Sequence, residues 1–239
     1  MALYPLSRGL RAVFVCNILS STLWFCCLGR FLLLLPLVGR RFLPAAIADF
    51  FHIVAVLPLV TFFVVNLMGR ENHKSSDFWG LFNAARMVWI CYGVIYPHPK
   101  IAKHTSYLTL ILTWCILNLI DSTYYAFKVK THSSPMWLFR LHHLHFFITA
   151  PVAIVSEMIL IFLSGTYEKH HVYELFLDGC LIAYLPIAFF AFKHLLARKK
   201  DKYDDYLEKR RLGRSGGVEL SGALGSVPNE QPEAGQPET

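Results

Sequence analysis

Several ionisable and hydroxyl side chains of this 239-residue sequence lie inside long apolar stretches, where they are suited to proton transfer. Glu157 stands out among them, because residues 147–167 contain no lysine or arginine that could neutralise it locally. An ionisable group at membrane depth needs a partner, a water-filled cavity or a function, since burying it costs free energy. Glu157 is therefore a candidate proton donor or acceptor.

The other polar groups in the apolar stretches allow two interpretations of Glu157. In the first, Arg86 forms a buried ion pair with Glu157 or Asp121 that only fixes how the helices pack. In the second, these groups belong to an active site, in which Arg86 orients Glu157 or holds a carbonyl oxygen. The full set of polar candidates is Arg30, Asp49, His52, Arg86, Asn118, Asp121, Tyr124, Tyr125 and Glu157.

A histidine-rich stretch, Arg140-Leu-His-His-Leu-His145, invites comparison with metal sites. Di-iron membrane hydroxylases and desaturases use several histidine-rich boxes, whereas here only the adjacent pair His170-His171 accompanies this stretch. Histidines at the interface between membrane and water are the simpler interpretation. We therefore expect neither a metal nor another cofactor.

The elements that must position these groups are membrane-spanning helices. The sequence is 55% apolar and 16% charged, whereas soluble domains carry about 25% charged residues. A helix that crosses a hydrocarbon core needs roughly 20 mainly apolar residues, and lipid offers no hydrogen-bond partners to an exposed backbone. The sequence thus predicts an all-α, six-transmembrane-helix bundle. Its spans are residues 12–38, 46–68, 79–97, 105–127, 138–163 and 173–195.

The distribution of charge predicts the orientation and the domain boundary. Most lysines and arginines lie at the two ends of the chain and in the loops on the same side of the six spans. Because basic residues stay on the cytoplasmic side, both termini are expected in the cytosol. We expect a membrane domain over residues 1–200 and a basic segment with a disordered tail over residues 201–239. A basic cluster beside a span is typical of contact with anionic lipid, so no nucleic-acid partner is expected.

The fourth to sixth spans resemble the 3-hydroxyacyl-CoA dehydratases of very-long-chain fatty acid elongation, also called the protein tyrosine phosphatase-like family. The matching pieces have the family's order and spacing, and weaker similarity lies around Asn17–Trp24 and Asn83–Arg86. They are Trp114-Cys-Ile-Leu-Asn-Leu-Ile-Asp-Ser-Thr-Tyr124-Tyr125, the stretch from Pro151 to Glu157, and Ala183-Tyr184-Leu-Pro186-Ile with Phe192-Lys-His194.

The resemblance implies a six-helix protein of the endoplasmic reticulum membrane with cytosolic termini. It also implies an activity, the removal of water from a long-chain (3R)-3-hydroxyacyl-CoA to give a trans-2-enoyl-CoA. Elongase and reductase subunits would be protein partners, and Lys74, Lys128 and Lys130 would meet the phosphates of CoA. No cofactor or metal is implied for this carbon-oxygen lyase.

The sequence departs from the family's site at several positions. The family pairs a tyrosine and a glutamate in the pattern Y-P-x-G-x-x-x-E, and here the tyrosine is Ala150, the glycine is Ala153 and the glutamate is Glu157. A glutamate and an arginine of the fourth span become Asn118 and Asp121, and the arginine that opens the fifth becomes His142.

Dehydration needs a base for the proton on C2 and an acid that assists loss of the hydroxyl from C3. Alanine has no proton to exchange, so a second group must come from another position. Tyr124 and Tyr125 are the first candidates and His145 the next.

Three functions remain open from the sequence. The first is the dehydratase, with Glu157, Tyr124 and Tyr125 as catalytic residues and with Arg86 and His145 binding or orienting the substrate. The second is a catalytically inactive family member that acts as a scaffold or regulator of the elongation complex, which the missing tyrosine favours. The third is a small lipid or ion carrier built around the charges of Arg86, Asp121 and Glu157.

Overall fold

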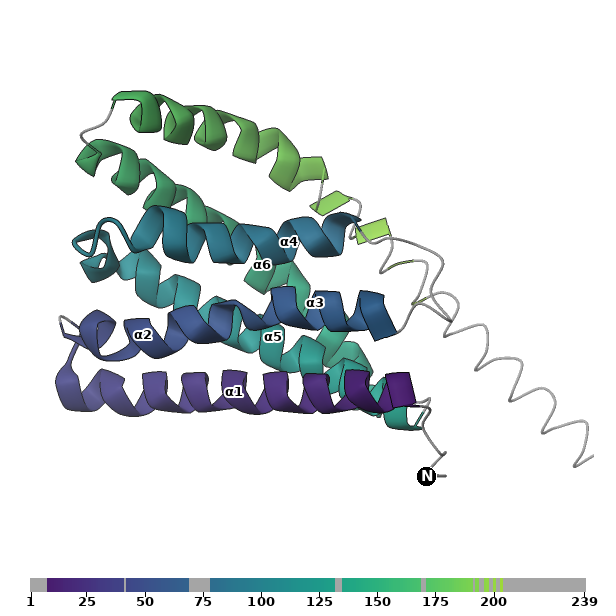
Figure 1. Ribbon diagram of the computed structural model, residues 1–239. Coiled ribbons are helices and arrows are strands. Elements are labelled where there is room, and N and C mark those ends of the chain that lie inside the picture. Colours follow the sequence, from purple (N-terminus) through teal and green to yellow (C-terminus); the bar gives the residue numbers. More distant parts are fainter. Residues whose placement is uncertain are drawn as a thin grey trace, which may run out of the picture. The chain divides into compact units, whose positions relative to one another are not determined.

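The computed structural model describes residues 8–40, 42–68, 78–131, 135–168 and 171–190, together with 192, 193, 196, 197, 200 and 203. Within these residues every regular element is a helix, which confirms the all-α prediction (Figure 1). The elements are α1 (Arg8–Val38), α2 (Leu43–Ala55), α3 (Leu57–Met68), α4 (Phe78–Trp89), the π-helix η1 (Ile90–Ile95), the short 3₁₀-helix η2 (Ile101–Lys103), α5 (Thr105–Thr131), α6 (Met136–Tyr167) and a last helix, His171–Phe190.

Five helices of the described chain are long and apolar enough to cross a membrane: Arg8–Val38, Leu43–Leu67, Thr105–Thr131, Met136–Tyr167 and His171–Phe190. They correspond to five of the six predicted spans. The predicted span 79–97 corresponds to a shorter apolar helix, Gly80–Ile95. Large apolar side chains such as Leu33, Leu37 and Ile148 point outward along the long helices, as expected of surfaces that face lipid.

Prolines explain two interruptions of the helices. Pro58 has no N–H to donate, and the helix breaks at Val56, where α2 ends and α3 begins. After α4 the chain widens into the π-helix η1, which ends before Pro97. Side chains from other helices bind the carbonyl groups of η1, since Tyr173 Oη donates to Gly93 O (2.8 Å) and Ser164 Oγ donates to Val94 O (3.4 Å).

The core of the bundle forms where α5 packs against both α1 and α6. The ring of Phe51 from α2 lies at its centre, with Trp24, Tyr107 and Trp114 at centroid distances of 6.4, 6.0 and 5.8 Å. The interface between α1 and α5 also carries hydroxyl pairs, in which Ser122 donates to Ser20 (3.2 Å) and Ser21 pairs with Thr123 (2.8 Å). These contacts hold α5 in place, and α5 in turn carries part of the candidate site.

The chain divides into two compact units, Met1–Phe192 and Lys193–Thr239. The first contains all the helices named above and every residue of the candidate site. The predicted disordered tail, residues 212–239, lies outside the described residues.

Candidate functional site

Glu157 lies on the buried face of α6 and its side chain has no exposed surface. Ala150, Ala153, Leu160 and Ser164 lie on the same face at helical spacing, and all are buried. The apolar sequence around Glu157 therefore places the carboxylate in the interior of the bundle.

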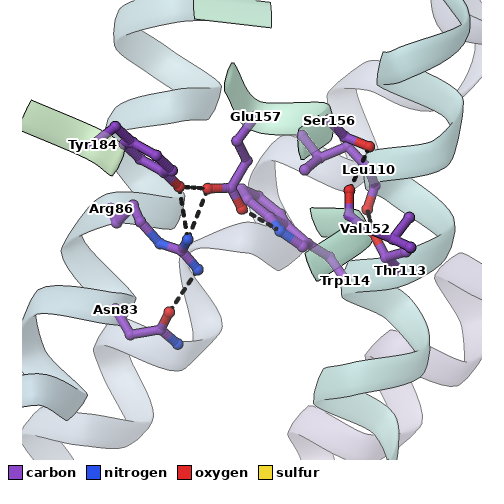
Figure 2. Close-up of polar contacts among 9 residues, drawn as sticks. All are labelled: Asn83, Arg86, Leu110, Thr113, Trp114, Val152, Ser156, Glu157 and Tyr184. Atoms are coloured by element: carbon purple, nitrogen blue, oxygen red, sulfur yellow. Dashed lines mark hydrogen bonds and ion pairs between the residues drawn. The ribbon is translucent and has the colours of Figure 1, made fainter. Parts of the chain in front are cut away.

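Three side chains from three other helices contact the Glu157 carboxylate (Figure 2). Arg86 Nη1 from α4 lies 2.8 Å from Oε2. Trp114 Nε1 from α5 donates to Oε1 at 3.0 Å. The hydroxyl of Tyr184, from the last helix, donates to Oε2. Both oxygens are thus bound, and four helices meet at one carboxylate.

Arg86 is itself held by two further hydrogen bonds. Its Nη1 donates to the Tyr184 hydroxyl (2.7 Å) and its Nη2 donates to Asn83 Oδ1, one turn earlier on α4 (2.7 Å). Asn83 is exposed and the side chain of Arg86 is 19% exposed, so these two α4 residues connect the buried carboxylate to the surface. We call Asn83, Arg86, Trp114, Glu157 and Tyr184 the Glu157 network.

Neighbouring hydroxyl groups do not join this network. Ser156 Oγ donates to Val152 O (2.8 Å), and Thr113 Oγ1 donates to Leu110 O (3.0 Å), each within its own helix (Figure 2). The partners of Glu157 are therefore one cation, one indole and one phenol, which together stabilise the charged form of a buried carboxylate.

A second polar group of residues lies between α5 and α6, towards the end of α5 and the start of α6. His142 Nδ1 lies 2.8 Å from Asp121 Oδ1, and His145 Nε2 lies 3.7 Å from the same oxygen. The Tyr124 ring stacks on His142 at a centroid distance of 4.1 Å, and Tyr125 meets the edge of His142 at 5.9 Å. We call these five residues the Asp121 cluster.

The structure brings only some of the predicted site residues together. Arg86 pairs with Glu157, which is one of the two partners predicted for it. Tyr124, Tyr125 and His145 gather instead around Asp121 and His142. His145 and Glu157 are twelve positions apart on α6, which is about 18 Å along the axis. The catalytic and orienting roles given to these residues remain predictions.

Trp114 and Tyr184 were not predicted as contacts of Glu157, although both lie in pieces of the sequence that carry the family resemblance. The polar N–H or O–H group of each side chain could have predicted the contact. A buried tryptophan N–H or tyrosine O–H usually finds a hydrogen-bond partner, and a carboxylate in the next helix is the strongest acceptor at hand.

Other ionisable groups are arranged separately. Arg30 Nη2 donates to Ala46 O (2.7 Å) and joins α1 to α2. His98 Nε2 lies 3.1 Å from Glu168 Oε2 near the end of α6. Within the part of the chain that the structure describes, no group of three or more histidine, cysteine, aspartate or glutamate side chains is arranged to hold a metal ion.

Comparison with known families decides what kind of protein carries this network. The family model of the protein tyrosine phosphatase-like proteins, PTPLA, matches residues 72–205, which is more than half of the chain. This chain belongs to the protein tyrosine phosphatase-like (PTPLA) family. The resemblance seen in the sequence is confirmed, and the matched segment contains the whole Glu157 network and the whole Asp121 cluster.

Three relatives of known name are similar to the chain. The chain is 28% identical to the beta-1,6-glucan synthesis-associated protein KEG1 of Saccharomyces cerevisiae, over 75% of this chain and 92% of the yeast protein. It is 27% identical to the very-long-chain (3R)-3-hydroxyacyl-CoA dehydratase PASTICCINO 2 of Arabidopsis thaliana, over 34% of this chain and 37% of the plant protein. It is 25% identical to a probable dehydratase of the same type from Schizosaccharomyces pombe, over 53% of this chain and 62% of that protein.

The chain thus spans less than two thirds of either dehydratase but nearly all of the glucan synthesis-associated protein. No solved structure matches the chain. The relatives that match the chain therefore carry two kinds of name, very-long-chain (3R)-3-hydroxyacyl-CoA dehydratase and beta-1,6-glucan synthesis-associated protein.

Proposed function

We propose that this chain is a PTPLA family member without dehydratase activity, which acts in the endoplasmic reticulum membrane as a partner protein in β-1,6-glucan synthesis. One observation carries the proposal. Position 150 is an alanine where the dehydratase pattern has a tyrosine, and the remaining glutamate of that pattern, Glu157, is enclosed in a network that joins four helices.

The arrangement of Glu157 suits a structural role. A base that removes the C2 proton must approach the substrate, but the Glu157 side chain is fully buried and both oxygens already accept hydrogen bonds. Ala150 lies two turns earlier on the same face, about 10 Å along α6, and supplies no group that exchanges a proton. The network instead resembles an interhelical clamp, because its charges and donors are used on one another.

The similarity to the yeast glucan synthesis-associated protein supports the process that we propose. That similarity extends over 92% of the yeast protein, whereas the similarity to the plant dehydratase extends over 37% of it.

Complementation in two hosts tests this proposal. In Saccharomyces cerevisiae cells depleted of KEG1, expression of the chain is expected to restore the β-1,6-glucan content of the cell wall. In Schizosaccharomyces pombe cells depleted of the related probable dehydratase, the same chain is expected to leave 3-hydroxyacyl-CoA accumulation unchanged. Rescue of the second host without the first would contradict the proposal.

A second candidate function is the dehydratase itself, and the position of Tyr184 favours it. Tyr184 places a phenol against Glu157, so the tyrosine and glutamate that the family pairs on one helix are here paired across two. In that mechanism Glu157 takes the C2 proton of a long-chain 3-hydroxyacyl-CoA, and Tyr184 gives a proton to the departing hydroxyl, which leaves as water. Enoyl-CoA formation that is lost in Tyr184→Phe and kept in Tyr125→Phe would support this candidate over the first.

A further inference from the structure

A groove of about 510 Å³ lies between α1 and α3, outside the family-matched segment. One face of α1 forms most of it, and α3 contributes one residue. Two arginines line it together with small and apolar side chains, and its lining surface is almost entirely apolar. The lining residues are Arg8, Arg11, Ala12, Val15, Cys16 and Val64.

The depth of these residues along α1 separates a polar end from an apolar end. α1 has 31 residues and is therefore about 46 Å long, close to the thickness of a bilayer with its headgroup layers. Arg8 and Arg11 lie in the first turn, at the level of lipid headgroups. Cys16 lies eight residues after Arg8, about 12 Å deeper, at the level of acyl chains.

The charge of the groove is of one sign. Arg8 and Arg11 are both exposed, and the described residues that line the groove include no acidic side chain. A third cation lies at the same end of α1, because Lys130 Nζ is 5.1 Å from the centroid of the Phe14 ring. Arginine binds phosphate oxygens with two parallel N–H donors. Arg8 and Arg11 are therefore complementary to the phosphate of a lipid headgroup whose net charge is negative.

We propose that this groove binds an anionic glycerophospholipid, with its phosphate on Arg8 and Arg11 and one acyl chain along Ala12, Val15 and Val64. The proposal does not depend on the function proposed above, because the groove lies on helices far along the chain from the Glu157 network. It gives the protein a means of preferring membrane regions that are rich in anionic lipid.

Two native cysteines of α1 allow a direct test. Cys16 lines the groove, whereas Cys26 is exposed on the same helix outside it. The purified full-length protein in dodecyl maltoside micelles is treated with N-ethylmaleimide, and mass spectrometry follows alkylation of each cysteine as phosphatidylserine is added. Phosphatidylserine is expected to slow alkylation of Cys16 and to leave Cys26 unchanged. Phosphatidylcholine and inorganic phosphate are expected to protect neither.

Variants identify the arginines as the cause. Each of Arg8→Gln and Arg11→Gln is expected to raise the phosphatidylserine concentration that half-protects Cys16 by about fivefold. Arg140→Gln removes an exposed arginine that does not line the groove and is the matched control. Equal protection by phosphatidylcholine, protection by free phosphate, equal slowing of Cys26, or full protection in the Arg8→Gln/Arg11→Gln variant would each overturn the proposal.

Discussion

Arg86 Nη1 lies 2.8 Å from Glu157 Oε2, so two residues that are 71 positions apart in the chain join α4 to α6 inside the bundle. The pair is completed by donors from α5 and the last helix. If this ion pair is structural, substitutions in it should lower the stability of the fold. If it is catalytic, they should abolish enoyl-CoA formation in a protein that still folds.

Removing one member of the pair is expected to destabilise the protein strongly. Glu157→Leu leaves Arg86 without its counter-ion, and breaking a buried pair costs about 3–5 kcal/mol. Thermal unfolding in detergent micelles measures the loss. The double variant Arg86→Met/Glu157→Leu is expected to be more stable than Glu157→Leu, since it leaves no unpaired charge. If Glu157→Leu and the single variant Arg86→Met both unfolded at the wild-type temperature, the pair would not be what holds the helices together.

The Tyr184 hydroxyl is expected to matter for stability as well. Tyr184→Phe removes the donor to Glu157 and the acceptor for Arg86, and the lost hydrogen bonds to charged groups are worth about 1.5–3 kcal/mol. Tyr96→Phe is the control, because that side chain is 70% exposed. The same unfolding measurement compares them, and an equal effect of both substitutions would argue against a special role for Tyr184.

Gly93 in the π-helix is expected to tolerate no side chain. A Cβ atom there would lie 2.9 Å from Trp89 Cδ1, closer than carbon atoms approach without displacement. Gly93→Ala should therefore destabilise by about 1–3 kcal/mol. Gly179→Ala is the matched control, since a Cβ at that position meets nothing within 4 Å. A Gly93→Ala protein as stable as Gly179→Ala would mean that Trp89 and η1 shift without cost.

The predicted orientation is testable by labelling from one side of the membrane. In sealed microsomes, an impermeant maleimide is expected to label Lys200→Cys and to label Lys100→Cys only after the membrane is opened. The reason is that Lys200 belongs to the basic end of the chain, which the distribution of positive charge assigns to the cytosol. The opposite pattern would reverse the topology.

Length and hydropathy were enough to predict most of the fold. Runs of about 20 apolar residues predicted five helices that are long and apolar enough to cross a membrane. A backbone in lipid has few alternatives to a helix. The segment 79–97 was less predictable. Its hydropathy resembles that of a span, but its described helix is Gly80–Ile95 and widens into a π-helix, whose carbonyl groups are bound by Tyr173 and Ser164 from helices more than 60 residues away.

The candidate site was predictable only in part, for a similar reason. The charges of Arg86 and Glu157 at membrane depth required partners. The sequence left Glu157 and Asp121 as the two possible partners of Arg86, and the structure pairs Arg86 with Glu157. Which tyrosine reaches Glu157 depends instead on how the helices are arranged. Tyr124 and Tyr125 lie on α5 beside His142, while Tyr184 comes from a helix that carried no ionisable candidate in the sequence analysis.

We propose that the Glu157 network stabilises the bundle and performs no dehydration. Turnover of a long-chain (3R)-3-hydroxyacyl-CoA by the purified protein tests it most directly, measured as enoyl-CoA formed by the wild type and by Glu157→Gln. No product above background is expected from either protein. Product formed by the wild type and lost in a folded Glu157→Gln variant would instead assign Glu157 to catalysis and would rule out a purely structural role.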